Sequence, residues 1–303
     1  MASAVSVRPK QKIRESASDR IFMFFVYAIL SIIIVLVLYP LVYILSSSIS
    51  SPLAVTSGRV WLWPVDISFK GFATIFKTPQ IMTGYANSLF YTAAGTMISV
   101  ILTIMLAYPL SRKTFYGRSF ILIMVTFTML FSGGLIPTYL VVKELGMIDT
   151  RWALLIPNAI WVWQVIIARS FFQATIPNEL IEAGELDGCS DWKFLTSVVL
   201  PLSKPIIAVL VLMYAVGQWN AYFDALIYLK SDKLYPLQIV LRSIIIQNNS
   251  NGVMDPSIQV ERAQLAELLK YSLIVVATLP VLIIYPFVQR FFVQGMLVGS
   301  VKG

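Results

Sequence analysis

Residues 22–45 read FMFFVYAILSIIIVLVLYPLVYIL, a stretch without one charged side chain. An α-helix rises about 1.5 Å per residue, so about 20 apolar residues cross the roughly 30 Å hydrocarbon layer of a bilayer. The stretch is too long for the core of a signal peptide and no small-residue cleavage site follows it. It therefore predicts a retained membrane-spanning helix, and with it an all-α integral membrane protein.

The composition of the whole chain supports this class. Of 303 residues, 58% are apolar and 13% are charged, whereas soluble domains carry about 25% charged residues. Such a chain is too apolar to be disordered. In a chain this apolar, the net charge of +8 is better explained by basic residues that orient membrane spans than by nucleic-acid binding, so no nucleic-acid partner is expected. With no histidine and only one cysteine, Cys189, we expect no metal site and no enzymatic activity.

Five further apolar stretches are long enough to span, which gives six predicted transmembrane helices. The six stretches are 22–45, 88–110, 120–141, 152–168, 206–229 and 271–288. Prolines within or beside them predict kinks, since proline lacks a backbone donor: Pro109, Pro137, Pro157, Pro280 and Pro286. The pair Pro280 and Pro286 is the preferred place for a bend that moves.

The positions of lysine and arginine predict the orientation of these helices. Basic residues precede the first span and crowd the link between the second and third: Arg8, Lys10, Lys12, Arg14, Arg20, Arg112, Lys113 and Arg118. These segments are expected in the cytoplasm. Six crossings return the carboxyl terminus to the cytoplasm and place the link 169–204 there. The links 46–87 and 230–270 then face outward.

The link 169–204 is long and has helical sequence on both sides of a break. Pro177-Asn178 is a helix start, and Gly188 is able to take the left-handed conformation that closes a helix. Ser190 or Asp191 can cap a second helix over 192–200, which Pro201 and Pro205 are expected to stop. The pattern predicts a helix, a tight turn and a helix with an acidic tip. The simple alternative is an interfacial elbow with solvated charges.

The residues of this elbow resemble the EAA signature of permease subunits of binding-protein-dependent ABC importers. The matching positions are Glu182-Ala183-Gly184, Asp187-Gly188, Phe194, Leu200-Pro201 and Pro205. Two positions depart from the common form, because Gly184 and Cys189 stand where alanine is usual. Both replacements are small, although glycine loosens a helix by about 1 kcal/mol relative to alanine.

The resemblance implies a type I ABC importer permease fold whose elbow is the coupling helix, docked on a cytoplasmic ATPase subunit. The residues expected to couple to the ATPase are Glu182, Ala183, Gly184, Asp187, Gly188, Phe194 and Pro201. The implied partners are a second, homologous permease, two ATP-binding subunits and an extracytoplasmic solute-binding protein. The implied location is the bacterial cytoplasmic membrane. ATP and magnesium would bind to the partner ATPases, and this chain would bind no cofactor.

The end of the chain extends the resemblance to maltose-type carbohydrate permeases, whose tail reaches between the two ATPase subunits. The similar residues are Gln289-Arg290-Phe291-Phe292, Gly295 and the closing 299–303. Gly299, Lys302 and Gly303 are the docking residues on this view, and the alternative is a frayed tail. The domain organisation is then a cytoplasmic segment 1–21, a permease domain 22–294 with the coupling loop at about 171–204, and a cytoplasmic tail 295–303.

The stretches 131–134 (FSGG) and 136–139 (IPTY) are similar to the branch of this family that imports complex oligosaccharides, including uronate-containing fragments. The implied function is carbohydrate import by alternating access, driven by ATP hydrolysis on another chain. The dipeptide Gly-Lys of a phosphate-binding loop occurs nowhere in the sequence, which agrees with a separate ATPase. Two alternatives stay open: a carrier or channel acting alone, and a membrane scaffold that transports nothing.

The fifth predicted span carries the densest group of polar and aromatic residues at membrane depth. Its candidate substrate-path residues are Tyr214, Gln218, Trp219, Asn220 and Tyr222. Residues 214, 218 and 222 repeat every four positions and are expected to share a helix face. Amides and aromatic rings suit a sugar, but asparagine and glutamine also bond helices together. Trp161, Trp163 and Gln164 are a second candidate group.

Overall fold

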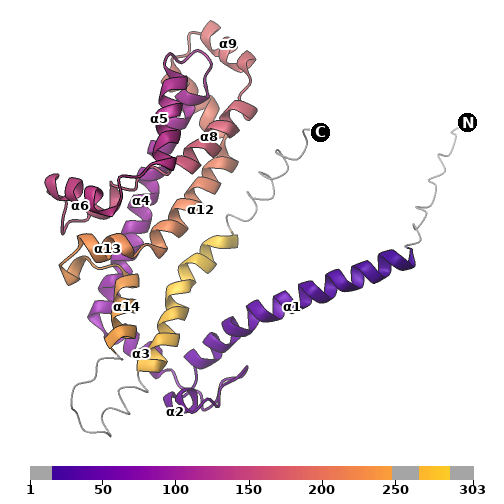
Figure 1. Ribbon diagram of the computed structural model, residues 1–303, viewed down its shortest axis with the longest axis vertical. Helices are drawn as coiled ribbons and strands as arrows, with labels where there is room; N and C mark the ends of the chain where they lie inside the picture. Colours follow the sequence, from indigo (N-terminus) through magenta and orange to yellow (C-terminus); the bar gives the residue numbers. More distant parts are fainter. Residues whose placement is uncertain (1–15, 248–265, 287–303) are drawn as a thin grey trace, which may run out of the picture.

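The computed structural model describes residues 16–247 and 266–286 of the chain (Figure 1). Every regular element in these two ranges is helical, so the predicted all-α class is confirmed for the described part. Three of the helices are long and apolar enough to cross a membrane. They are α1 (Ala17–Ser48), α4 (Pro79–Ser111) and the last described helix, Ala266–Pro286.

Helix α1 is continuous over the whole apolar stretch 22–45. It begins with a capping box, in which the Ser16 hydroxyl accepts a backbone hydrogen bond and Asp19 accepts one from the Ser16 N–H. Figure 1 shows α1 leaving the other helices, and none of its most apolar 18-residue window is buried. Its last turn is attached by Ser46, which donates to the Leu62 carbonyl, and by Ser48, whose carbonyl accepts from Ser272.

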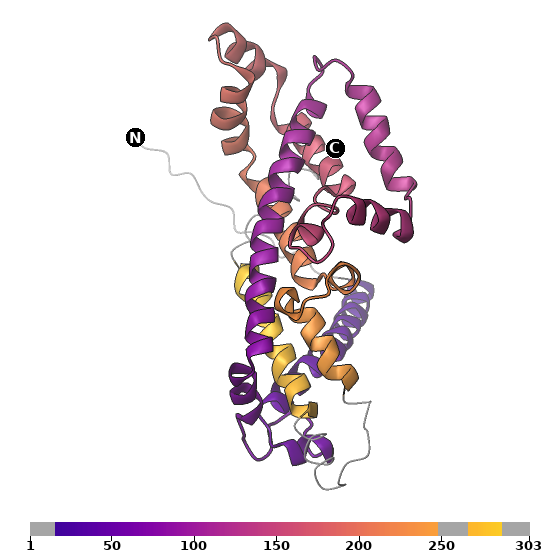
Figure 2. The same ribbon diagram turned by 90° about the vertical axis from the view of Figure 1, so that its left-hand side faces the viewer.

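Helix α4 is the axis of the bundle. The short helices α2 (Pro52–Thr56) and α3 (Lys70–Lys77) lead into it, and Figure 2 shows it as the purple helix along the long axis. Helices α8, α12 and α14 pack against its two halves. Since α4 contacts elements from most of the chain, its geometry sets where the others lie.

A row of polar side chains fixes one end of α4 to the segment that follows α13. Asn87 donates to the carbonyls of Lys233 and Tyr235, at 2.7 and 3.1 Å. One turn further along α4, the Tyr91 hydroxyl donates to the Leu234 carbonyl at 2.9 Å. All of these α4 side chains are buried, so their polar atoms are satisfied inside the chain.

The third predicted span, 120–141, is not one helix. Helix α5 (Arg118–Leu130) ends at Phe131, and α6 (Leu135–Glu144) departs at 116° to it. Gly134 has a φ of 85°, a left-handed conformation that glycine adopts without strain. The Ser132 hydroxyl accepts from the Gly134 N–H and stabilises the turn. The prediction of a single helix is wrong here because turn-forming residues interrupt the apolar stretch.

The fourth predicted span, 152–168, is also divided. Helix α7 (Trp152–Leu155) is a single turn, residues 156–161 are not in a regular helix, and α8 runs over Val162–Thr175. Pro157 lies in the break, where its missing N–H removes a helical hydrogen bond. Helix α8 therefore begins ten residues later than predicted and continues into the expected cytoplasmic link.

The fifth predicted span, 206–229, divides near its end. Helix α12 (Lys204–Asn220) stops at Ala221, and α13 (Phe223–Tyr228) starts after Tyr222. The chain continues through a 3₁₀ turn (Asp232–Leu234) into α14 (Leu237–Gln247). The sixth predicted span is helical from the first described residue, Ala266, which precedes Tyr271, and it continues through Pro280; residues 287 and 288 lie outside the described ranges.

In the described part, three straight helices and two bent pairs can each account for a crossing. The bent pairs are α5 with α6, and Asp191–Leu202 with α12, the latter at 82°. The count of six spans stays a prediction.

Candidate functional site

The elbow after α8 has the predicted helix, turn and helix. Helix α9 (Asn178–Leu186) begins directly after Pro177, and none of its residues is buried. Glu179 lies in its first turn, where the helix dipole favours a carboxylate. Figure 1 shows α9 at one extreme end of the molecule, beyond the ends of α5 and α8.

The turn after α9 is closed by backbone hydrogen bonds around a left-handed glycine. Gly188 has a φ of 68°. Its N–H donates to the Glu185 carbonyl at 3.0 Å, and the Cys189 N–H donates to the Gly184 carbonyl at 2.9 Å. These two bonds are the Schellman motif, which ends helices at glycine. The prediction that Gly188 closes the helix in a left-handed conformation is confirmed.

The second helix of the elbow is longer than predicted. Ser190 caps it by accepting from the Lys193 N–H at 3.4 Å, and the helical path runs from Asp191 to Leu202. Its middle part, Leu195–Val199, is a π-helix. The expectation that Pro201 stops the helix is wrong, since Pro201 follows the π turn at a position where its missing N–H is tolerated.

Phe194 ties the elbow to the bundle. Its ring is buried, and a Cβ atom placed on Gly184 would lie 2.8 Å from its Cδ2. The Arg112 guanidinium lies 5.6 Å from the Phe194 ring and 5.5 Å from the Tyr108 ring near the end of α4. The contact requires a residue without a side chain at 184, which gives a physical reason for glycine there.

The tip of the elbow presents acidic and apolar side chains together. Glu182, Glu185 and Asp187 are exposed, and so are Leu186 at 89% and Trp192 at 65%. Leu186 and Trp192 therefore add exposed apolar area beside the carboxylates of the tip. Of the predicted coupling residues, Glu182, Ala183, Asp187, Gly188 and Pro201 are exposed, Gly184 is half-buried and Phe194 is buried. Gly299, Lys302 and Gly303 lie outside the described residues.

The candidate path residues of α12 separate into two groups. Tyr214 and Trp219 are buried and bonded within the chain. The Tyr214 hydroxyl lies 2.7 Å from the Thr103 hydroxyl and accepts from the Trp161 N–H at 3.2 Å. The Trp219 indole N–H donates to the Ala277 carbonyl at 2.9 Å. These two residues hold helices together, which is the packing alternative stated for this group.

The other three candidates lie near the end of α12, at or beside the break between α12 and α13. Gln218 is half-buried and packs against Gly95 of α4. Asn220 is exposed, and its amide donates to the Val216 carbonyl. Tyr222 is 44% exposed and follows the end of α12. The expected common face of 214, 218 and 222 is wrong, because the helix ends before residue 222.

A small cavity of about 130 Å³, with several polar groups in its lining, lies where α12 and α13 meet the start of α8. It is lined by Gln218, Trp161 and the pair Asn158–Asp224, in which the asparagine amide donates to the carboxylate at 2.7 Å. The amides and the carboxylate can bind hydroxyls, and the Trp161 ring offers an apolar face on which a sugar can stack. The sequence pattern missed Asn158, although its place directly after Pro157 signals a break in the span.

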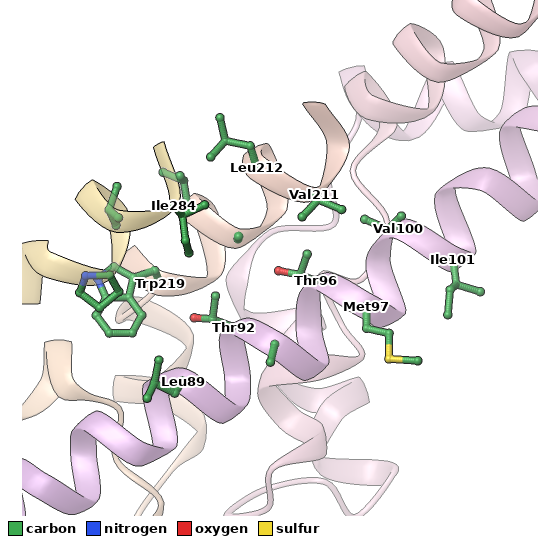
Figure 3. A pocket seen from close by; sticks show the side chains of 15 residues that line it. Leu89, Thr92, Thr96, Met97, Val100, Ile101, Val211, Leu212, Trp219 and Ile284 are labelled. Carbon is green, nitrogen blue, oxygen red and sulfur yellow. The ribbon is translucent and has the colours of Figure 1, made fainter. Parts of the chain in front are cut away.

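A larger groove of about 560 Å³ is almost entirely apolar. Figure 3 shows it between α4, α12 and the last described helix, with Thr92, Thr96, Val211, Trp219 and Ile284 among its lining. The hydroxyls of Thr92 and Thr96 are buried without a hydrogen-bond partner in the described part of the chain. Such a lining suits hydrocarbon or an apolar helix rather than a sugar.

No family model matches the sequence. Two relatives in Bacillus subtilis (strain 168) match most of it. Protein LplC is 41% identical over 268 residues, 87% of this chain and 89% of LplC. The polygalacturonan/rhamnogalacturonan transport system permease protein YtcP is 40% identical over 287 residues, 94% of this chain and 99% of YtcP.

A solved structure has the same fold. It is a chain of a bacterial ABC transporter involved in the import of the acidic polysaccharide alginate. Its sequence is 36% identical to this chain, and the two structures superpose with a TM-score of 0.85 over 93% of this chain and all of the other. The bends and breaks described above therefore lie within a fold that a solved permease shares.

Proposed function

The chain belongs to the family of permease subunits of carbohydrate-importing ABC transporters, and on that premise we propose that it passes uronate-containing oligosaccharides into the cytoplasm. Two similar proteins carry names that specify polygalacturonan/rhamnogalacturonan and alginate, both acidic polymers. Membership of this family removes the stand-alone carrier and the scaffold as readings of the chain.

In the proposed complex, this chain pairs with a second permease, two ATP-binding subunits and an extracytoplasmic solute-binding protein. The bundle crosses the bilayer six times, with both termini and α9 in the cytoplasm. ATP and magnesium bind to the ATPase subunits. Closure of those subunits moves the elbow, and the bundle exposes its path alternately to the two sides.

The observation that carries the coupling role is the shape of the elbow. To transmit a movement, the elbow needs a fixed turn, a fixed attachment to the bundle and an accessible contact surface. The hydrogen bonds at Gly188 fix the turn, and the buried Phe194 fixes the attachment to the bundle. The exposed side chains of Glu182, Leu186 and Trp192 supply the contact surface.

We propose that the sugar passes Gln218, Asn158 and Asp224, which line the cavity of about 130 Å³, and that the apolar groove of Figure 3 contacts the second permease. The cavity supplies hydrogen-bonding groups and the Trp161 ring. The groove supplies an apolar surface of the kind that packs against a membrane helix.

The test is purification of the tagged chain from its native membrane, followed by identification of its companions and assay of ATP-driven uptake. We expect an ATPase with a phosphate-binding lysine to co-purify. Glu182→Lys is expected to abolish coupled uptake while the solute-binding protein still binds sugar. Asp232→Lys is the matched control, since Asp232 is equally exposed but lies far along the chain from the elbow. Full uptake by Glu182→Lys would overturn the coupling role.

A further inference from the structure

The break between α12 and α13 presents an aromatic ring and a cation together. The guanidinium carbon of Arg242, on α14, lies 5.5 Å from the centre of the Tyr222 ring. Both side chains are exposed. An arginine over a ring is held by cation–π attraction while its N–H edge stays available to a carboxylate.

Two amide side chains come from the same two segments: Asn220 is two residues before Tyr222 on the chain, and Gln238 is on α14 with Arg242. Asn220 and Gln238 line a cavity of about 340 Å³ between α12, α14 and the last described helix. Gln238 is four residues before Arg242, so the two share a face of α14. The Gln238 amide reaches the Trp219 carbonyl at 3.5 Å, which places α14 directly against the end of α12.

Arg242 has no acidic partner in the described part of the chain, where the ion pairs join Arg59 to Asp66 and Lys270 to Glu267. The acid nearest to the break in sequence, Asp224, accepts a hydrogen bond from Asn158. Within the described residues, its N–H donors are therefore not taken up by a carboxylate.

The position of Arg242 along the bundle fits the mouth of a path. Residues on the same helix, Leu237 and Val240, lie within 3.4 Å of a Cβ atom placed on Gly84, near the start of α4. Arg242 therefore lies toward the end of the bundle opposite α9. Charged residues near the end of a span are tolerated far better than at its centre.

We propose that Tyr222 and Arg242 form a carboxylate-binding subsite for a uronic acid residue, with the sugar ring on Tyr222, the carboxylate on Arg242 and the hydroxyls on Asn220 and Gln238. The subsite rests on the proposed import function and specifies the charge of its substrate. A neutral sugar has no group that replaces the carboxylate, so the subsite favours acidic over neutral oligosaccharides at the outer mouth.

The test uses the complete transporter with its binding protein in phosphatidylcholine vesicles. Uptake of trigalacturonate is compared with uptake of the neutral trisaccharide obtained by reducing its carboxyl groups, each at a concentration that saturates the binding protein. Arg242→Gln is expected to lower uptake of the acidic probe about tenfold or more, the loss typical of one charge-assisted hydrogen bond. Uptake of the neutral probe is expected to stay unchanged.

Two further variants separate the subsite from a general effect of charge. Arg242→Lys is expected to restore part of the acidic uptake, since lysine keeps the charge but not the fork of donors. Lys233→Gln removes an exposed cation from the neighbouring 3₁₀ turn and is expected to affect neither probe.

The proposal is overturned if Arg242→Gln slows both probes equally, or slows uptake only in vesicles that contain phosphatidylglycerol, since the arginine is then a lipid anchor. It is also overturned if the variant slows neither probe, or if the unaltered transporter imports only the neutral one. If the unaltered transporter imports no carbohydrate, the proposed function itself fails.

Discussion

Thr103 of α4 and Tyr214 of α12 join the two helices through hydroxyl oxygens 2.7 Å apart, and both side chains are fully buried. Tyr214→Phe is expected to lower the free energy of unfolding by about 1 kcal/mol, because the Thr103 hydroxyl and the backbone N–H of Trp161 lose their hydrogen-bond partner. Thermal unfolding in detergent measures this loss. When Thr103→Val is combined with Tyr214→Phe, we expect the two losses in unfolding free energy to differ from additivity by a coupling free energy of about 0.6 kcal/mol. Strictly additive losses would show that the bond contributes nothing.

Gly184→Ala is expected to destabilise the elbow, although alanine is the better helix former. A Cβ atom at 184 would lie 2.8 Å from the buried Phe194 ring, so the ring must move. The clash is expected to outweigh the propensity gain of about 1 kcal/mol. Unfolding of the purified complex measures the result. In a background that carries Phe194→Leu, alanine at 184 should raise the free energy of unfolding instead of lowering it. Ala183→Gly, at an exposed position, measures the contribution of helix propensity alone. A stabilised Gly184→Ala single variant would contradict the contact.

Gly217→Ala is expected to displace the Trp161 ring into the cavity of about 130 Å³. The ring atoms Cζ2 and Cζ3 lie 3.0 and 3.2 Å from a Cβ atom placed at 217, and one further ring atom, Cη2, is nearer still. We expect a stability loss of about 1–3 kcal/mol, a shift in tryptophan emission and slower sugar uptake. Gly133→Ala is the control, since its added Cβ would meet only Pro137, at an ordinary 3.7 Å. Equal behaviour of the two variants would argue against a close approach at Gly217.

Asp149 fastens the segment before α7 to the end of α13. Its carboxylate accepts from the Ser231 hydroxyl and from the N–H groups of Lys230 and Ser231, at 2.9 and 2.8 Å for the latter two. These donors, the Ser231 hydroxyl foremost, hold the pKa of Asp149 below its ordinary value. The carboxylate therefore stabilises the fold above the ordinary pKa of aspartate, and this contribution is lost as the pH falls through the lowered value.

Asp149→Asn should consequently lower the melting temperature at neutral pH, and the difference from the unaltered chain should shrink only below about pH 4. Asparagine suits the left-handed backbone at this position, where φ is 58°, so the variant tests the charge rather than the turn. Melting curves at a series of pH values measure the difference. A gap that closes already near pH 6 would show that another group is responsible.

The elbow could be predicted closely from sequence because local signals determine it. Pro177 starts α9, Gly188 closes its turn and Ser190 caps the next helix, each through the short-range chemistry expected. The length of the second helix could not be predicted, because a π turn before Pro201 removes the conflict that proline otherwise creates.

The breaks in the spans were less predictable because hydropathy does not report backbone direction. Ser132-Gly133-Gly134 and Pro157-Asn158 are turn signals that lie inside apolar stretches, and both prove to be breaks. The break at Ala221 has no such signal. Likewise, composition could not separate Tyr214, which bonds to Thr103, from Tyr222, which is exposed beside Arg242. That difference depends on partners distant in sequence.

Helix α1 has consequences for how a cell makes this protein. Its apolar window finds no cover within the described chain, and only its last turns are attached. In a bilayer, lipid tails are as apolar as these side chains and cover them, so a newly synthesised copy can insert α1 before the helix has any protein neighbour along most of its length.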